Sequence, residues 1–330
     1  MMGTIHSFWA MFMTVGLNLV CLFLFLVPTW AQDYPNKPIT LYCGYAAGAT
    51  TDLTARALAM GAEKILGVPV MVDNKPGGTS TVCAGLIASK KPDGYNLAAV
   101  DTGVVSKSNF LYKISYNAEK DFTYVLQYTR YIGGLCVHGD SPIKNIDEFI
   151  AWAKSKPGLM YGTPGMYSQQ HLAMEVFNRC KDLKLKHIPY KGGSEAVTAF
   201  LGKHTDFLGG SGSHIPYVKQ GAFRMLLVYN TSDKRDPIFP DVPVLRELGC
   251  EDYPPWGMVI VGPRGLPDPM VKKLSAVFKQ VAEGPDFQNL LKQLNLPYDF
   301  KDGAQLAKDL PKETEWNRAF FKKIGAMKEG

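Results

Sequence analysis

Four loops rich in glycine and other small residues each follow a short apolar run and precede a helical pattern. They span Gly44–Asp52, Gly77–Ser80, Gly162–Gln170 and Gly209–Ser213. An apolar run followed by a helix is typical of a βα unit, so the series predicts open, mainly parallel sheets with right-handed crossovers. In such sheets the loops gather at the carboxyl ends of the strands, where ligands bind. The repeated loops therefore predict an α/β protein with a ligand site at a sheet edge.

The first part of the chain has a β-α-β-α-β order. The predicted elements are strands at Ile39–Cys43, Val68–Val72 and Asn96–Val100, with helices at Leu53–Leu66 and Thr81–Ser89 between them. The first of these helices carries one stripe, formed by Leu53, Ala57, Met60 and Lys64.

The middle of the chain repeats this alternation. Strands are expected at Leu135–His138, Leu159–Tyr161, Leu185–Ile188, Asp206–Leu208 and Met225–Tyr229, with helices such as Ile146–Lys156 and Ser194–Leu201 between them. Residues 237–269 are rich in proline and are expected to form a return crossing between two domains. Two C-terminal helices, Met270–Ala282 and Ala304–Lys323, are expected after it.

The first 31 residues contain no Lys, Arg, Asp or Glu, and Phe8–Val27 is almost continuously apolar. This pattern predicts a signal peptide that is cleaved after Ala31. The stretch is also long enough to span a bilayer, so an uncleaved membrane anchor is the alternative. Both interpretations place the folded part outside the cytoplasm.

The formal charge of +6 therefore belongs to the part of the chain after residue 31. The basic residues are scattered, which argues against a nucleic-acid-binding surface and indicates only a mild preference for anionic partners. Five cysteines remain after Ala31, and no pair has CxxC spacing, so neither a zinc site nor a redox motif is predicted. Cys43 and Cys83 lie in apolar stretches and are expected to be buried thiols.

The loops have the chemistry of an anion site. Each opens a helix whose first backbone N–H groups are unpaired, and Thr50, Thr51, Thr163 and Ser168 add hydroxyl donors. Small residues at tight turns and Thr or Asp at helix starts are also ordinary features of βα loops. Several such loops together favour a shared ligand cleft. Tyr45 and Tyr167 are candidates to line it, although a single loop tyrosine more often serves packing.

Enzyme motifs fit the sequence poorly. The first loop lacks both the Gly-Lys-Ser/Thr ending of a P-loop and the full GxGxxG spacing. The sequence "GGSGS" around Ser211 resembles a nucleophile elbow but ends in Ser213 instead of glycine. The histidines have no HxxxH or HExxH spacing, and Asp52 with Arg56 has the i,i+4 spacing of a local ion pair. No catalytic residue, metal site or cofactor is therefore predicted.

Longer stretches resemble a known family. They include "YPNKPITLYCGYAAGATTDLTARALA" from Tyr34, "VDNKPGGTSTVCAGLIASKKPDGYNL" from Val72, "YGTPGMYSQQHLAMEVF" from Tyr161 and "HIPYKGGSEAVTAFLGKHTDFLGGS" from His187. The likeness continues through "FPDVPVLRELG" and "WGMVIVGPRGLP". These motifs, in this order, resemble the Bug-type or TctC-like solute-binding receptors of the tripartite tricarboxylate transporter system. The resemblance covers nearly the whole chain after the leader.

The resemblance implies a two-lobed periplasmic-binding-protein fold of type II, the Venus flytrap. One lobe would comprise residues 32–131 and 255–330, the other residues 132–254, with the ligand cleft between them. It further implies a periplasmic monomer that holds a small organic acid and passes it to membrane transporter subunits. The implied ligand-binding residues, together with the two loop tyrosines, are Tyr45, Gly48, Ala49, Thr50, Asp52, Asp101, Thr102, Thr163, Tyr167, Ser168, Lys191, Gly192, Gly193 and Ser211.

The sequence departs from the family pattern at Ala49, Cys43 and Asp101, so the identity of the ligand does not transfer. A dicarboxylate, tricarboxylate, amino acid, aromatic acid or uncharged ligand all remain open. Two other functions are also open. One is a ligand sensor for a membrane signalling protein. The other is a hydrolase on the same scaffold, with Ser211 or Asp52 as the reacting group and His214 as the nearest base in the sequence.

Overall fold

The computed structural model describes residues 34–229, 235–250 and 256–327. The described residues from Lys37 onward belong to one compact unit. The predicted signal peptide, residues 1–31, lies outside the described residues. Within the described ranges, none of the helices combines the length and the apolar character needed to cross a bilayer.

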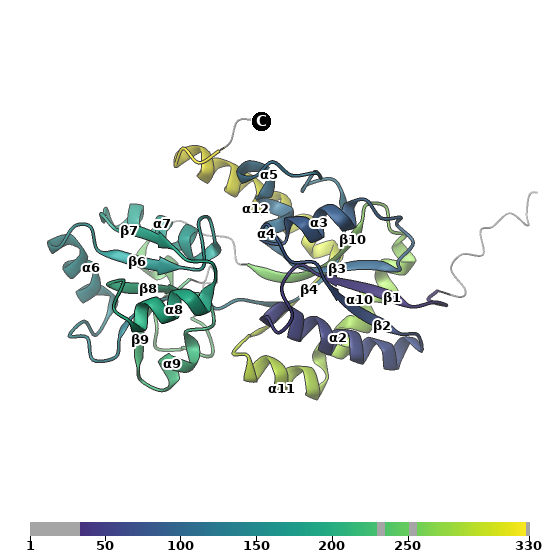
Figure 1. The fold of residues 1–330 in the computed structure, drawn as a ribbon, viewed down its shortest axis with the longest axis horizontal. Helices are drawn as coiled ribbons and strands as arrows, with labels where there is room; N and C mark the ends of the chain where they lie inside the picture. The colour runs from purple at the N-terminus through teal and green to yellow at the C-terminus, as the bar shows by residue number, and fades with distance from the viewer. Residues whose placement is uncertain (1–33, 230–234, 251–255, 328–330) are drawn as a thin grey trace, which may run out of the picture. The chain divides into compact units, whose positions relative to one another are not determined.

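The first sheet has six strands in the order β11-β4-β10-β3-β1-β2 (Figure 1). Their bounds are β1 Ile39–Cys43, β2 Val70–Asn74, β3 Asn96–Asp101, β4 Phe122–Arg130, β10 Gly257–Pro263 and β11 Tyr298–Asp302. Strand β1 pairs in parallel with β2 and β3, whereas β10 runs antiparallel to both β3 and β4. Strand β11 is antiparallel to β4. We call this sheet with its helices the first lobe.

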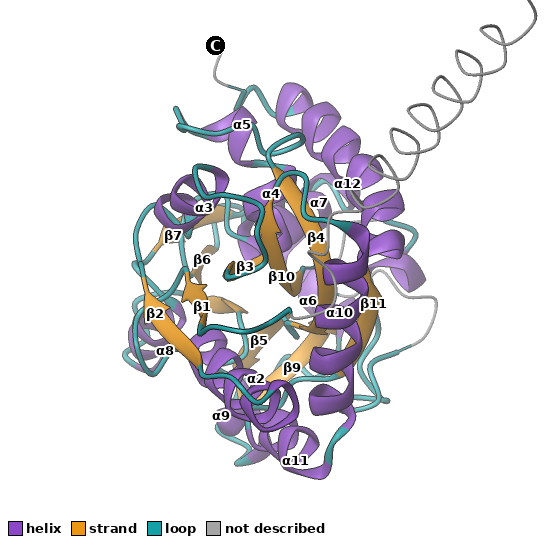
Figure 2. Ribbon diagram, turned by 90° about the vertical axis from the view of Figure 1, so that its right-hand side faces the viewer, coloured by secondary structure: helices purple, strands orange, loops and turns teal. Residues whose placement is uncertain are grey.

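Helices cover both faces of the first sheet (Figures 1 and 2). One face carries α2 Thr50–Leu66, α10 Asp268–Glu283 and α11 Pro285–Gln293; the other carries α3 Thr81–Ala88, α4 Thr102–Ser106, α5 Ser108–Leu111 and α12 Gly303–Lys323. Helices α2 and α10 approach closely, because a Cβ atom on Gly61 would lie only 2.4 Å from Val281 Cγ1. Glycine at this position therefore allows the two helices to pack.

The second sheet has five strands in the order β7-β6-β8-β5-β9. Its elements are β5 Gly134–His138, α6 Ile146–Ser155, β6 Met160–Thr163, α7 Gln169–Cys180, β7 Lys186–Pro189, α8 Gly193–Leu201, β8 Phe207–Gly210, α9 Ile215–Lys219 and β9 Phe223–Val228. Side chains alternate between its faces: Leu135 packs in the core with α6 and α7, and Cys136 in the core with α8 and α9. We call this sheet with its helices the second lobe.

The chain crosses between the sheets twice, and the two crossings are bonded to each other. The first follows β4, and the second returns through Trp256 to β10. Tyr131 N donates a hydrogen bond of 3.1 Å to the Trp256 carbonyl. Arg130, at the end of β4, makes a 2.8 Å ion pair with buried Asp236, which precedes the 3₁₀ helix η2 Leu245–Leu248. These bonds fix the chain where it changes sheets.

The structure confirms two sheets flanked by helices, but both sheets are mixed instead of mainly parallel. β1 with β2 and β3, and β6 with β7 and β8, are the parallel pairs; β5 is antiparallel to β8 and β9. Strands β4, β10 and β11 were not predicted. Strand β10 lies inside the proline-rich stretch that was predicted to be only a crossing, and its seven residues are all buried.

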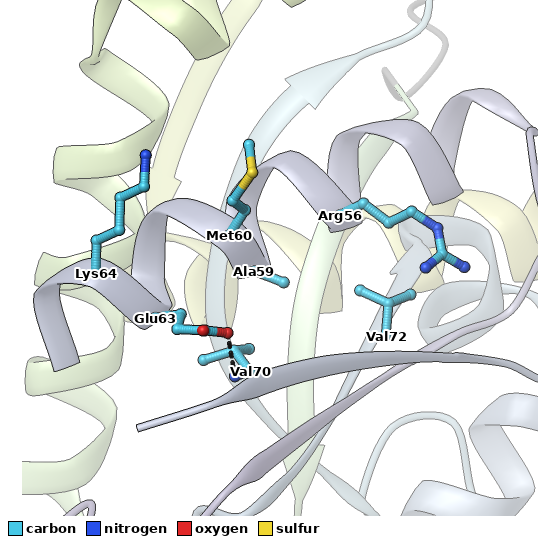
Figure 3. A pocket seen from close by; sticks show the side chains of 7 residues that line it. All are labelled: Arg56, Ala59, Met60, Glu63, Lys64, Val70 and Val72. Atoms are coloured by element: carbon cyan, nitrogen blue, oxygen red, sulfur yellow. Dashed lines mark hydrogen bonds between the residues drawn. The ribbon is translucent and has the colours of Figure 1, made fainter. Parts of the chain in front are cut away.

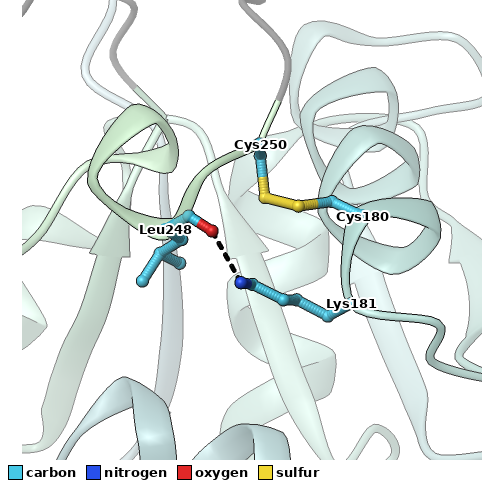
Figure 4. Close-up of a disulfide and its surroundings, with 4 residues drawn as sticks. All are labelled: Cys180, Lys181, Leu248 and Cys250. Atoms are coloured by element: carbon cyan, nitrogen blue, oxygen red, sulfur yellow. Dashed lines mark hydrogen bonds between the residues drawn. A yellow bond between two sulfur atoms is a disulfide. The ribbon is translucent and has the colours of Figure 1, made fainter.

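One disulfide joins Cys180, at the end of α7, to Cys250, two residues after η2 (Figure 4). Lys181 Nζ reinforces the junction by donating a hydrogen bond of 2.6 Å to the Leu248 carbonyl. Cys43 and Cys83 are buried free thiols, which confirms the prediction for both. The bridge was not predicted. It fastens the segment before the return crossing to the helix that starts at the loop of Tyr167 and Ser168.

Replacing both cysteines, in Cys180→Ser/Cys250→Ser, should lower the free energy of unfolding by about 2–4 kcal/mol, because the bridge closes a long loop in the unfolded chain. Denaturant unfolding of both proteins with and without reductant measures the effect. Reductant should destabilise the wild type alone. If reductant lowered the unfolding free energy of the double variant as much as that of the wild type, the disulfide would not be the source of the stability.

Candidate functional site

The first predicted loop is held in place by Asp52. This carboxylate accepts hydrogen bonds from Gly48 N at 2.8 Å, Asn74 Nδ2 at 2.8 Å and Arg56 Nε at 3.1 Å. Burial raises the pKa of Asp52, but the bonds from Arg56, Gly48 and Asn74 outweigh this effect and the pKa falls below its ordinary value. Gly48 has φ +81°, which favours glycine. Asp52 therefore orders the loop at the start of α2.

Strand register brings Tyr45 and Asp101 together. Cys43 of β1 lies beside Ala99 of β3 in a parallel pair, so the residues two positions further along each chain emerge side by side. The Tyr45 hydroxyl donates a hydrogen bond to Asp101 Oδ2. Asp101 is 1% exposed, and its Oδ1 has no hydrogen-bond partner within the described part of the chain. Burial raises the pKa of Asp101, although Tyr45, Lys107 and the backbone N–H groups of Gly103 and Val104 oppose the shift.

A buried lysine that sequence reasoning missed lies beside this pair. Lys107, between α4 and α5, is 5% exposed, and its Nζ lies 3.6 Å from the centroid of the Trp256 ring. The ammonium donates a 2.8 Å hydrogen bond to the carbonyl of Tyr167, a residue of the second lobe. Burial lowers the pKa of Lys107 to about 7, while the charges of Asp101 and Glu313 act in the opposite direction. Lys107 thus connects predicted loops of both lobes.

Glu313, on α12, adds a second carboxyl group to this cluster. Ser106 Oγ donates a 2.6 Å hydrogen bond to Glu313 Oε1. Burial raises the pKa of Glu313 to about 7, against the opposing effects of Ser106 and Lys107. Asp101, Lys107 and Glu313 therefore form a group of coupled charges at the end of β3, of which only Asp101 was predicted from the sequence.

In the second lobe, Thr163 and Ser168 lie together at the end of β6. Ser168 caps α7 by accepting a hydrogen bond of 3.3 Å from His171 N, and Ser168 Oγ donates to Thr163 Oγ1 at 3.5 Å. Thr163 Oγ1 also lies 2.6 Å from His187 Nε2. The rings of His187 and His171 stack with centroids 3.8 Å apart. Burial lowers the pKa of His171 to about 3 and that of His187 to about 4, so both stack as neutral rings.

The loops around α8 and β8 also meet. A Cβ atom on Gly193 would lie 2.4 Å from Ser211 Oγ, so glycine is needed at the first residue of α8. His214 is fully buried, and its Nδ1 accepts a hydrogen bond of 3.1 Å from Gly212 N. Lys191 has an exposed side chain, and its backbone N–H donates to Glu195 at 2.8 Å.

The structure therefore pairs Tyr45 with Asp101, Thr163 with Ser168, and Gly193 with Ser211. The other predicted residues lie at element boundaries: Ala49 and Thr50 begin α2, Thr102 begins α4, and Gly192 precedes α8. Whether all of them contact one ligand stays a prediction.

A separate hollow lies between α2 and β2 (Figure 3). Its lining consists of Arg56, Ala59, Met60, Glu63, Lys64, Val70 and Val72, and Glu63 accepts a hydrogen bond of 3.3 Å from Val70 N. None of the site residues predicted from the sequence is among these lining residues. Over the described ranges, no group of His, Cys, Asp and Glu side chains is suited to hold a metal ion.

Comparison with known proteins identifies the family. Residues 54–326 match the model of the "Tripartite tricarboxylate transporter family receptor", TctC. The chain belongs to this family. It is a TctC-family periplasmic solute-binding protein, as the sequence motifs predicted.

Individual relatives agree with this assignment. A Cupriavidus necator protein described as "UPF0065 protein in gbd 5'region" is 37% identical, with 90% of each chain covered. The periplasmic binding protein BugD is 28% identical with a TM-score of 0.75, covering 90% of this chain and all of its own. An R. palustris protein solved with adipate has a TM-score of 0.77 at 23% identity, covering 89% of this chain and 99% of its own. The two-lobed fold predicted for the family is thereby confirmed.

Glu313→Gln should make stability depend less on pH. A raised folded-state pKa means that the stabilisation is present below the ordinary value of 4.5 and is lost as pH rises through about 7. Between pH 5 and 7 the unfolding free energy of the wild type should fall by about 1–3 kcal/mol relative to the variant. Urea unfolding at intervals across this range gives the difference. Parallel curves for the two proteins would contradict the raised pKa of Glu313.

Proposed function

We propose that this protein captures a small organic carboxylate in a cleft between its two lobes and delivers it to a membrane transporter of the tripartite tricarboxylate type. The proposed lobes are residues 32–131 with 255–330, and residues 132–254. Membership of the receptor family supports this role, and the family supports a periplasmic location. The proposed site comprises the loop residues predicted from the sequence, together with Lys107.

The observation that carries the proposal is the bond from Lys107 Nζ to the Tyr167 carbonyl. It joins a buried cation of the first lobe to the loop that begins α7 in the second lobe. Hydroxyl groups and helix N-termini from both lobes have the chemistry to complete an anion site around it. A ligand carboxylate can gain roughly 1.5–3 kcal/mol from each charge-assisted hydrogen bond, and micromolar binding needs about −8 kcal/mol in total.

A ligand that contacts both lobes would stabilise one arrangement of the lobes over others. We expect the change between arrangements to occur at the two crossings. Domain closure around ligands occurs at a few residues between rigid parts. Tyr131 and Trp256, which bond to each other across the crossings, are the proposed hinge residues. The transporter would then recognise the ligand-bound arrangement.

A hydrolase is a weaker candidate. His214 is the base nearest to Ser211 in the sequence, but its Nδ1 accepts from Gly212 N. The other nitrogen, Nε2, has no hydrogen-bond partner among the described residues. Asp52 already accepts hydrogen bonds from Gly48 N in the first loop, Arg56 of α2 and Asn74 of β2. A ligand sensor for a membrane signalling protein would use the same cleft, and co-purification with a transporter subunit would distinguish the two roles.

Small carboxylates should raise the melting temperature of protein that has been unfolded, freed of ligand and refolded. The rise should increase with ligand concentration for one class of acid, as measured in a thermal-shift screen of residues 32–330. Absence of any rise across mono-, di- and tricarboxylates, with an uncharged compound stabilising instead, would contradict the proposed ligand class.

Ser211→Ala should weaken binding of that acid by about 10- to 100-fold, because it removes one hydroxyl donor to a charged group. Thr198→Ala is the matched control, since Thr198 lies exposed on the neighbouring helix α8 and its hydroxyl donates to the Ser194 carbonyl of the same helix. Calorimetry on both variants measures the change. Equal affinities for the two variants would remove Ser211 from the site.

A further inference from the structure

Asp101 and Lys107 are oppositely charged and buried, and each has unused capacity to form hydrogen bonds. Asp101 Oδ2 accepts from Tyr45, whereas Oδ1 has no well-aligned hydrogen-bond partner within residues that the structure describes, and the backbone N–H groups of Gly103 and Val104 at the start of α4 are further donors near the carboxylate. The Lys107 ammonium has three N–H donors, of which one is used by the Tyr167 carbonyl while the Trp256 ring lies against the group. Buried polar groups nearly always have hydrogen-bond partners in native proteins, so we expect a bound molecule to supply further partners for Asp101 and Lys107.

Asp101 and Lys107 together complement a ligand that carries both a carboxylate and a hydrogen-bond donor. A carboxylate oxygen accepts from the free donors of a lysine, and a hydroxyl or ammonium group donates to a carboxylate such as that of Asp101. Asp101 and Lys107 lie at the two ends of the five-residue helix α4, as its N-cap and its C-cap. A ligand that reaches both must therefore carry a hydrogen-bond donor as well as a carboxylate, and 2-hydroxy and 2-amino acids are the simplest ligands of this kind.

We propose that Asp101 and Lys107 form a selectivity pair, in which Lys107 binds the ligand carboxylate and Asp101 binds a hydroxyl or ammonium group on the adjacent carbon. The inference rests on the proposed function and narrows its ligand class to substituted acids. An unsubstituted acid would leave Asp101 Oδ1 without a donor, and sites built to bond a polar group reject analogues that lack it.

Other charged groups near the pair do not supply the missing partners. Glu313 accepts from Ser106, and Tyr45 already donates to Asp101 Oδ2. The neighbouring rings of His171 and His187 stack on each other, and His171 Nδ1 accepts from Tyr167 N. If Asp101 and Lys107 were no more than a structural ion pair, ligand substituents would make no difference to affinity.

Matched sets of acids test the proposal on ligand-free, refolded protein by calorimetry. Each set contains an acid without a substituent, its 2-hydroxy form and its 2-amino form: propionate, lactate and alanine; succinate, malate and aspartate; glutarate, 2-hydroxyglutarate and glutamate. In the set that binds most tightly, a substituted acid should exceed the unsubstituted one by at least about tenfold.

Variants assign the preference to the two residues. Asp101→Asn should reduce the ratio between substituted and unsubstituted acids to about one, because an amide no longer offers two anionic acceptor oxygens. Lys107→Met should weaken every acid by at least about tenfold, whereas Lys113→Met, at an exposed position nearby in the chain, should change neither ratio nor affinity. Circular dichroism and the melting temperature establish that each variant is folded.

The possible outcomes distinguish failure of the selectivity pair from failure of the proposed receptor function. Binding of acids with equal affinity for substituted and unsubstituted forms overturns the selectivity pair and leaves the receptor function intact. Binding of no acid in any set overturns the carboxylate receptor and the pair together. The ratio in the wild type decides the question even if Lys107→Met fails to fold.

Discussion

Trp256 is the residue on which the site and the crossings both depend. Its carbonyl accepts the hydrogen bond from Tyr131 that joins the two crossings, and its ring lies against the Lys107 ammonium. The ring also packs on the start of α4, where a Cβ atom on Gly103 would lie only 2.1 Å from it. Trp256 therefore links the crossing directly to the charged group at the candidate site.

Much of the fold could be predicted from local patterns, because loop chemistry marks each βα unit. The stripe of Leu53, Ala57, Met60 and Lys64 expected on α2 is not the buried face of the helix. Leu53 and Met60 are 38% and 60% exposed, whereas the buried face is made largely of small residues such as Ala55, Ala59 and Ala62. Close packing of α2 against α10 and the sheet leaves no space there for larger side chains. Strand β10 was missed because a central buried strand has no alternation, and the surrounding prolines suggested a crossing.

The candidate site was only partly predictable, because some of its residues come together from segments far apart in the sequence. The first-loop and β3 residues are neighbours through strand register, which follows from the βα order. The environment of Lys107, in contrast, comes from α12, the return crossing and the second lobe, and no local spacing links Glu313, Trp256 and Tyr167. A single lysine within the apolar and small residues after β3 is the one signal in the sequence, and its burial becomes evident only from the fold.

The charges at the end of β3 have consequences for what can bind there. The charges of Asp101 and Glu313 both raise the pKa of Lys107, so the cluster already contains carboxyl groups that compete with a ligand carboxylate for the Lys107 ammonium. A simple anion would meet repulsion as well as attraction. A ligand that brings a donor to Asp101 relieves that repulsion while its own carboxylate binds Lys107. If the proposed function holds, charge balance within the cluster, more than net positive charge, selects ligands with both a carboxylate and an adjacent donor.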